Sequence, residues 1–383
     1  MHNWHRPLTS QKHNHEADDN HPGLGVPVIT SPTASSVSLR DDDNRMQALY
    51  YPAFNTLRLE EVTMPELAPG EVLLQVAACG LCGSELETYK SSSSRRQPPL
   101  IMGHEFCGTV REVSSPEHTS LVGQKFVSNS VVPCGVCVRC SRGDTHLCAH
   151  RQVFGMDRHG GFAEFVNVPA HVLLPWPESL SPEAACLAEP LANGVHVVNL
   201  TSHLAVKTAL VIGAGPIGLM CQQVLQALRG AKVFVADLSE GRLHVASRLG
   251  AEAVLPSKNV NVLEEVQRRT GGEGVDLVVD AVGSADTKKL SIEASRPGGA
   301  VVWIGLYGNT IELDSYQVTL PERQILGTYA AKKEELAEAL ELMRSGKVDV
   351  TSWTEVAKIK DAVEVFHRML RPADNDIKAV FIP

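Results

Sequence analysis

The hydrophobic pattern of the chain changes near residue 208, and this change restricts the possible folds more than any other feature of the sequence. From there on, short apolar runs bounded by Gly or Asp lie at residues 208–212, 233–236, 277–279 and 301–304. Between the first two runs, residues 216–228 repeat apolar side chains with the period of a helix that buries one face. Alternating strands and helices are typical of a parallel sheet with crossover helices. We therefore expect an α/β fold with a doubly wound sheet over residues 191–329.

The preceding part of the chain has a different pattern. Residues 46–190 alternate β-rich runs, at 71–76, 106–110 and 162–168, with turns of Gly, Pro and Ser. This spacing predicts a small, barrel-like β domain whose first strand begins at Met46. A helix is expected near residues 334–344, where Gly346 would end it. A chain of 383 residues suits two folded domains.

Residues 1–45 show neither helical nor strand periodicity and are rich in His, Asn, Asp, Pro and Ser. They lack the apolar stretch of a signal peptide, and the acids Asp41, Asp42 and Asp43 argue against a transit peptide. We expect a disordered tail, which a start codon placed too far upstream would explain equally well. The net charge of −9 gives no reason to expect nucleic-acid binding, and no apolar run of about 18 residues predicts a membrane span. We expect a cytoplasmic protein.

Four cysteines carry the most specific local signal. Cys134, Cys137, Cys140 and Cys148 follow the spacing C-x2-C-x2-C-x7-C in a glycine-containing loop. Four thiolates this close in sequence can surround one tetrahedral zinc ion, whereas disulfides would close very small loops and are rare in reducing compartments. We expect a structural zinc site, because four sulfur ligands leave no position for a substrate.

A second group has the residue types of a metal site without local clustering. Cys82 lies in a glycine-rich turn, His104 and Glu105 follow about twenty residues later, and Glu189 precedes the α/β part. One Cys, one His and one or two Glu match a catalytic zinc, which uses three protein ligands and an open fourth position. Taken singly, a buried cysteine, a loop histidine and a surface glutamate explain the same residues equally well.

The third motif is glycine-rich and joins the strand at 208–212 to the helix at 216–228. Its sequence, Gly213-Ala-Gly215-Pro216-Ile217-Gly218, fits a tight turn that brings backbone N–H groups to a pyrophosphate at a helix N-terminus. Asp237 ends the next apolar run, 19 residues after Gly218, where a carboxylate binds ribose hydroxyls and repels a 2′-phosphate. NAD is therefore favoured over NADP, although Arg242 lies nearby. Val282 completes the expected cofactor contacts.

The ordered strings GLCGSE (80–85), IMGHEF (101–106), the four-cysteine loop, GGFAEF (160–165), AEPLANGVH (188–196) and VIGAGPIGLM (211–220) resemble the zinc-containing medium-chain dehydrogenases. The resemblance implies a GroES-like catalytic domain, residues 46–190 completed by 330–383, with an inserted Rossmann domain. It implies a catalytic zinc held by Cys82, His104 and Glu189, with Glu105 as an alternating ligand. It also implies that Ser84 contacts the reacting alcohol, and that the protein forms dimers or tetramers.

Within this family, Glu rather than Cys at position 189 resembles the polyol and threonine dehydrogenases. Many relatives have a His where this chain has Glu87, which argues against L-threonine as the substrate. The strings GLCGSE, GHEF and IKAVFIP are most similar to galactitol-1-phosphate dehydrogenases. Lys90, Arg95 and Arg96 would suit a phosphate, but a solvated, serine-rich loop is the preferred interpretation. We expect hydride transfer from a polyol or sugar alcohol to NAD+; a short diol, L-threonine and a non-catalytic role are the alternatives.

Overall fold

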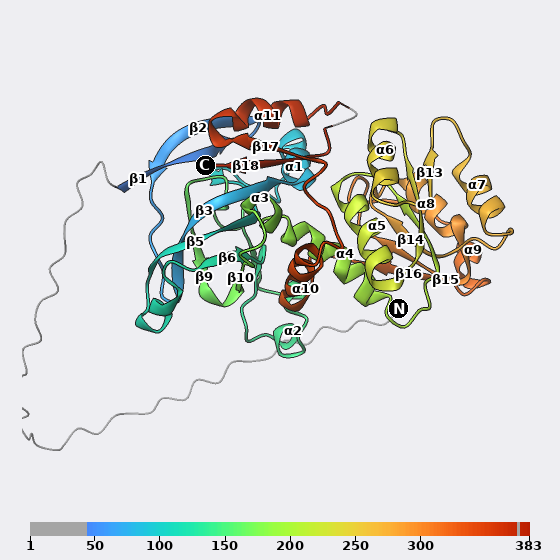
Figure 1. The fold of residues 1–383 in the computed structure, drawn as a ribbon, viewed down its shortest axis with the longest axis horizontal. Helices are drawn as coiled ribbons and strands as arrows, with labels where there is room; N and C mark the ends of the chain where they lie inside the picture. The colour runs from blue at the N-terminus through green and yellow to red at the C-terminus, as the bar shows by residue number, and fades with distance from the viewer. Residues whose placement is uncertain (1–43, 374–375) are drawn as a thin grey trace, which may run out of the picture. The chain divides into compact units, whose positions relative to one another are not determined.

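The computed structural model describes residues 44–373 and 376–383 (Figure 1). Nearly all of the expected tail therefore lies outside the described residues. Arg45, at its end, is already the first residue of strand β1. Among the helices of the described ranges, none has the length and apolarity needed to cross a membrane.

The β-rich part of the structure is built on a largely antiparallel sheet. Its strands follow the order β10-β6-β5-β3-β18-β17, and β9 pairs with β3 as well. A three-stranded sheet, β2-β1-β4, and the pair β7-β8 complete it. The strands are β1 (Arg45–Ala53), β2 (Thr56–Thr63), β3 (Glu71–Leu81), β4 (Leu100–Ile101), β5 (Glu105–Val113), β6 (Lys125–Ser128), β7 (Val131–Val132), β8 (Gln152–Val153), β9 (Phe165–Pro169), β10 (Leu173–Pro175), β17 (Thr354–Lys358) and β18 (Lys378–Ile382).

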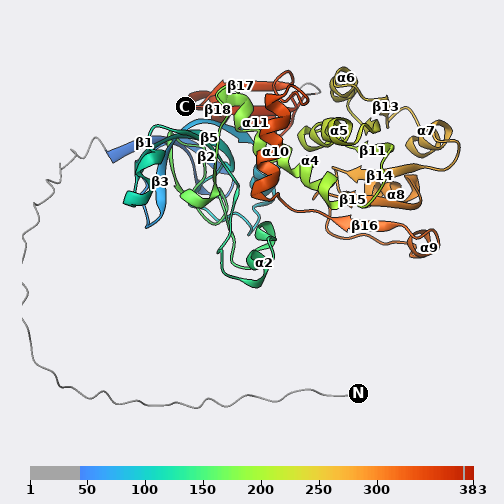
Figure 2. The same cartoon turned by 60° about the horizontal axis from the view of Figure 1, so that its bottom comes forward.

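The end of the chain returns to this sheet. Strand β18 runs antiparallel to β3, with Val380 opposite Gly80, and parallel to β17. In both views the red C-terminal strands lie within the β-rich part (Figures 1 and 2). The helices of this part are α1 (Gly83–Ser91), α2 (Val138–Ser141), α3 (Pro182–Ala185) and α11 (Ala362–Met369).

The second part is a six-stranded sheet in the order β13-β12-β11-β14-β15-β16, and every neighbouring pair in it is parallel. The strand order reverses between β11 and β14, and ligands of such sheets bind beyond the carboxyl ends of the strands at that point. The expected doubly wound α/β fold is confirmed. Its elements are β11 (Thr208–Ile212), α5 (Pro216–Arg229), β12 (Lys232–Asp237), α6 (Glu240–Arg248), β13 (Ala253–Pro256), α7 (Val262–Arg269), β14 (Val275–Asp280), α8 (Ala285–Ala294), β15 (Ser295–Trp303), α9 (Tyr316–Thr319) and β16 (Gln324–Gly327).

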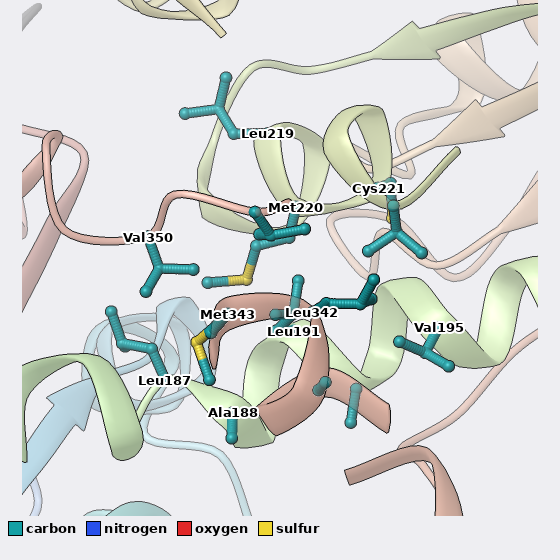
Figure 3. Close-up of a cluster of buried hydrophobic side chains, with 14 of the residues drawn as sticks. Leu187, Ala188, Leu191, Val195, Leu219, Met220, Cys221, Leu342, Met343 and Val350 are labelled. Atoms are coloured by element: carbon teal, nitrogen blue, oxygen red, sulfur yellow. The ribbon is translucent and has the colours of Figure 1, made fainter. Parts of the chain in front are cut away.

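A continuous apolar core joins helix α4 (Ala188–Leu200) to α5 and to α10 (Lys333–Arg344). Leu191 and Val195 of α4, Met220 of α5 and Leu342 of α10 are buried in one cluster (Figure 3). Burying a Leu or Met side chain contributes about 1.5–3 kcal/mol, so this cluster stabilises the packing of α4 against both α5 and α10. The first turn of α4 carries Glu189. The cluster therefore positions one of the expected zinc ligands.

One expected strand starts later than predicted. Residues 162–168 were expected to form a strand, but β9 begins at Phe165. The backbone N–H of Phe162 instead donates to the carbonyl oxygen of Met102 at 3.0 Å. The N–H groups of Gly160 and Gly161 donate to the carbonyl oxygens of Ile101 and Gly103, both at 2.8 Å. These bonds tie the chain to the segment before His104, which a strand pattern alone does not reveal.

Candidate active site

Cys82 lies where a strand meets a helix. Strand β3 ends at Leu81 and α1 begins at Gly83, which leaves Cys82 as the residue that caps the helix. The backbone N–H of Cys82 donates to the Glu85 carboxylate at 2.7 Å, and this bond fixes the turn. The end of a central strand and a capped helix thus hold the thiol in one place.

His104 and Glu105 approach Cys82 from the neighbouring strand. Gly80 of β3 lies opposite Glu105, the first residue of β5. The ligand atoms of Cys82, His104 and Glu105 all lie within 4.8 Å of one another. Thiolate, imidazole and carboxylate are the donor types that zinc accepts, so this group fits a zinc ion.

Glu85 orients the histidine of this group. Its Oε1 accepts a hydrogen bond from His104 Nδ1 at 2.7 Å, which leaves Nε2 as the ring nitrogen that can bind a metal. Burial alone would raise the pKa of Glu85, but His104 and Arg96 outweigh it and lower that pKa to about 2. A carboxylate on the second ring nitrogen is the usual support of a metal-binding histidine. Glu85 lies within the motif GLCGSE, but its sequence position alone did not predict this role.

Glu189 reaches the same cleft from helix α4. It is 9% exposed and lines the cleft together with Cys82 and His104, although it does not belong to the close three-residue group. Burial raises the pKa of its carboxyl group. Glu105, by contrast, is completely buried and forms an ion pair with Lys378.

The four cysteines of the predicted structural site come together in the loop around α2. The Sγ atoms of Cys137 and Cys140 are 3.5 Å apart, and those of Cys137 and Cys148 are 3.8 Å apart. Four sulfurs at about 2.3 Å from one tetrahedral ion would be separated by about 3.8 Å, whereas a disulfide needs about 2.05 Å. All four thiols are free. The sulfur spacing therefore fits a zinc ion and does not fit disulfides.

The glycine-rich motif lies between β11 and α5, beside the point where the strand order reverses. A Cβ atom at Gly218 would lie 1.7 Å from the carbonyl oxygen of Gly213, so only glycine fits there. Val282 packs against Gly213, and Arg242 Nη1 lies 4.0 Å from the Cβ position of Gly215. Pro216 and Ile217 form the first turn of α5 and line the cleft.

Asp237 ends β12 beside this loop. Its two carboxylate oxygens accept hydrogen bonds from the backbone N–H groups of Ala214, at 2.6 Å, and Ser239, at 2.7 Å. The carboxylate is thus held next to the turn where a dinucleotide pyrophosphate would bind. Its negative charge at this place suits ribose hydroxyls better than a phosphate ester.

One cleft of about 450 Å³ connects the metal-type residues with the glycine loop. Cys82, His104 and Glu189 line it, and so do residues 215–218 of the glycine loop. Ser84 also lines it, and its Oγ atom is buried without a hydrogen-bond partner. An unpaired buried hydroxyl is costly, so Ser84 is ready to bind a polar group that enters the cleft.

The prediction that the basic residues of the serine-rich loop are solvated is wrong for one of the three. Arg96 is only 1% exposed and donates to the carbonyl oxygens of Gly155 and Ser84, at 2.5 and 2.9 Å. It also contacts the hydroxyl of Thr88. Lys90 and Arg95 are exposed, as expected, and Arg95 lines the cleft. Arg96 is therefore a structural residue beneath the site and is not free to bind a phosphate.

Comparisons with known proteins agree with this geometry. Residues 216–345 match a family model described as zinc-binding dehydrogenase, and residues 68–178 match one described as alcohol dehydrogenase GroES-like domain. The L-threonine 3-dehydrogenase of Pyrococcus abyssi is 37% identical over 266 residues, which cover 69% of this chain and 76% of that protein. The D-arabitol-phosphate dehydrogenase of Enterococcus avium is 29% identical over 335 residues, covering 86% and 94%.

A solved structure has the same fold over most of its length. The galactitol-1-phosphate dehydrogenase of Escherichia coli superimposes with a TM-score of 0.81 at 25% identity, over 88% of this chain and 100% of that one.

Proposed function

Because the chain belongs to the zinc-containing medium-chain alcohol dehydrogenase family, we propose that it oxidises a secondary alcohol of a small polyol or sugar alcohol. The enzyme is zinc-dependent and NAD-linked and acts on a CH–OH group, so NAD+ is the hydride acceptor. One observation carries this proposal. A single cleft is lined both by Cys82, His104 and Glu189 and by the dinucleotide loop, so a small alcohol bound in it can meet the metal-type residues and the cofactor site.

In this proposal Cys82, His104 and Glu189 hold the catalytic zinc, and the four cysteines hold the structural one. Zinc in the catalytic site supplies a Lewis acid that lowers the pKa of an alcohol bound to it. Glu85 keeps His104 in the required orientation through its bond to Nδ1. The N-terminus of α5 provides free N–H groups for the cofactor phosphates, and Asp237 binds the ribose, which favours NAD over NADP.

The proton of the alcohol is proposed to leave through Ser84. Its Oγ lies at the cleft with no partner among the described residues, so it can accept a hydrogen bond from a substrate hydroxyl. Glu87 is exposed and lines the same cleft. A carboxylate there can pass the proton to solvent in the place of the histidine that many relatives have.

A second substrate class is favoured by the charges of the cleft. Glu87 and Arg95 are both exposed to it and carry opposite charges. A β-hydroxy amino acid such as L-threonine carries an ammonium and a carboxylate that would match this pair. Since Arg96 is buried, Arg95 is the only residue of the basic trio on the cleft, which weakens the case for a phosphorylated substrate.

The test is an NAD-reduction screen of the full-length protein at 340 nm. Polyols, their phosphates, short diols and L-threonine are compared at equal concentration, with NADP as a second acceptor. The proposal expects turnover of polyols and two zinc ions per chain, and it expects Cys82→Ser to lose one zinc and the activity. L-Threonine as the best substrate would favour the second class. Normal turnover by Cys82→Ser, with zinc in the cysteine lobe alone, would refute the assignment.

The remaining expectations stay predictions. These are a homo-oligomer, dimer or tetramer, a cytoplasmic location, and the boundaries of the catalytic domain at 46–190 and 330–383 and of the Rossmann domain at 191–329.

A further inference from the structure

The cysteine lobe, residues 134–148, lies beside a segment that lines the candidate active-site cleft. Thr328, Tyr329 and Ala330 all line this cleft, and they belong to the connection between β16 and α10. The mechanism proposed above uses none of these three residues, and it gives the cysteine lobe no part in the reaction. The contacts between the lobe and this segment are therefore unexplained by the proposed chemistry.

Arg151, three residues after Cys148, joins the lobe to this segment. Its guanidinium carbon lies over the ring of Tyr329, 4.8 Å from the centre of the ring. Its Nη1 donates a hydrogen bond to the carbonyl oxygen of Cys148 at 3.1 Å. A guanidinium within about 6 Å of an aromatic ring is attracted by the negative face of the ring. One side chain thus contacts both the backbone of a lobe cysteine and an aromatic ring in the wall of the cleft.

A second contact holds the far end of the same segment. The Lys332 ammonium lies 3.1 Å from Asp144 Oδ1, and Asp144 lies in the lobe between Cys140 and Cys148. Both side chains are partly exposed, so this ion pair alone stabilises little. Together with the stacked arginine, however, it attaches the segment to the lobe at two positions that are three residues apart.

The backbone between these two contacts has an unusual conformation. Ala330 has a φ of +52°, in the left-handed region that residues with a side chain rarely adopt. Such a residue persists where the contacts around it determine the backbone conformation. Tyr329 precedes Ala330 and Lys332 follows it, so the two contacts with the lobe lie on either side of the strained residue. They are placed to hold the segment in this conformation.

We infer that Arg151 is a positioning residue that holds the ring of Tyr329 in the wall of the cleft. That this wall meets the alcohol rests on the proposed function. Without the guanidinium the ring gains conformational freedom, and an alcohol that packs against it must order it again, which weakens binding. The cysteine lobe has no open ligand position of its own, and through Arg151 it shapes the place where the substrate binds.

The first test needs no substrate. The full-length protein is produced with 3-fluorotyrosine at its six tyrosines, and Tyr329→Phe identifies one fluorine NMR resonance as that of Tyr329. We expect Arg151→Met to shift and narrow this resonance, because the ring loses the charge over its face and moves more freely. Arg151→Lys should cause a smaller change, because an ammonium keeps the charge but cannot stack as a planar guanidinium does.

The matched control is Arg139→Met. Arg139 is an exposed arginine of the same lobe and donates to the carbonyl oxygen of Leu147 at 3.0 Å. Within the described part of the chain it stacks on no aromatic ring. Arg139→Met should therefore leave the resonance of Tyr329 at its wild-type position.

The second test is steady-state kinetics with the best alcohol of the screen described above. Arg151→Met should raise the KM for the alcohol about two- to five-fold, the range of a cation–π contact at a partly exposed site, with kcat, the KM for NAD+ and the zinc content unchanged. Tyr329→Ala should raise the same KM. Adding Arg151→Met to Tyr329→Ala should cause no further rise, because the guanidinium then has no ring to hold.

Two results would overturn the inference. One is a Tyr329 resonance that Arg151→Met leaves unchanged, or that Arg139→Met moves as far. The other is a double variant in which the two rises of KM multiply. Failure of the proposed function looks different: the wild type would turn over no alcohol of the screen, while the Tyr329 resonance would still respond to Arg151→Met and not to Arg139→Met.

Discussion

Replacing Arg96 by Met removes a cation from beneath the active site, and its effect can be worked out from the contacts of that side chain. The guanidinium bridges two segments, since it donates to the carbonyl of Gly155 and to that of Ser84. It also contacts Thr88 and lies 3.7 Å from the carboxylate of Glu85. Methionine fills a similar volume and satisfies none of these groups.

The expected cost is large because Arg96 and three of its four partners, Glu85, Thr88 and Gly155, are buried. Each hydrogen bond to a charged group contributes about 1.5–3 kcal/mol, and removing one member of a buried ion pair costs about 3–5 kcal/mol. These contributions overlap, because Glu85 keeps its bond to His104. We therefore expect Arg96→Met to lower the free energy of unfolding by about 3–5 kcal/mol. At about 2–4 °C per kcal/mol, this lowers the melting temperature by roughly 10 °C.

The assay is thermal unfolding, followed by calorimetry, of Arg96→Met, Arg96→Lys and the exposed neighbour Arg95→Met. Arg96→Lys should lie between the wild type and Arg96→Met, because one ammonium cannot reach all the acceptors of a planar guanidinium. Arg95→Met should melt like the wild type. If Arg96→Met melts within about 1 °C of Arg95→Met, Arg96 is not the buried bridge that the structure describes, and the magnitude worked out above is wrong.

Three further outcomes are expected. Cys140→Ser should lose one zinc per chain in metal analysis and melt at a lower temperature, because a structural zinc stabilises its lobe directly. Asp237→Ser should raise kcat/KM with NADP relative to NAD by about ten-fold or more, because the charge that repels a 2′-phosphate is gone; an unchanged ratio would remove Asp237 from cofactor selection. Burial raises the pKa of Asp276, but Arg296 and Thr208 outweigh it and lower that pKa below its usual 3.8. The ionised form therefore stabilises the fold above that value, and the stability is lost as the pH falls. Urea midpoints of the wild type and Asp276→Asn should differ at neutral pH and begin to converge as the pH falls below 3.8.

The parts of the site that the sequence predicts are those whose ligands lie close together in the chain or follow a recognisable spacing. The four cysteines lie within fifteen residues, so their spacing alone limits them to one small loop. The glycine loop was found for a similar reason, because strand, turn and helix follow one another directly. Cys82 and His104 were proposed from residue type and from their order along the chain, and the structure brings their ligand atoms together.

The contacts that could not be predicted join residues far apart in the sequence. Glu105 and Lys378 are 273 positions apart, and Arg96 reaches Gly155 across 59 positions. Lysine and arginine are usually exposed, so a buried cation is not the first interpretation of either residue. A signal was nevertheless present for Lys378, which is a single charge within the apolar run Ile377-Lys-Ala-Val-Phe-Ile of a strand. No comparable pattern marked Arg96, which lies in a serine-rich loop.

The return of strand β18 to the first part of the chain has a consequence for synthesis on the ribosome. Cys82, His104 and Glu105 emerge long before Lys378, which is 273 residues after Glu105. At about 5–20 residues per second, this interval lasts roughly 15 to 55 s. During that time the nascent β-rich segment lacks two strands of its largest sheet, and Glu105 lacks its cation. The ion pair between Glu105 and Lys378 can therefore form only after the last strand, β18, has been synthesised.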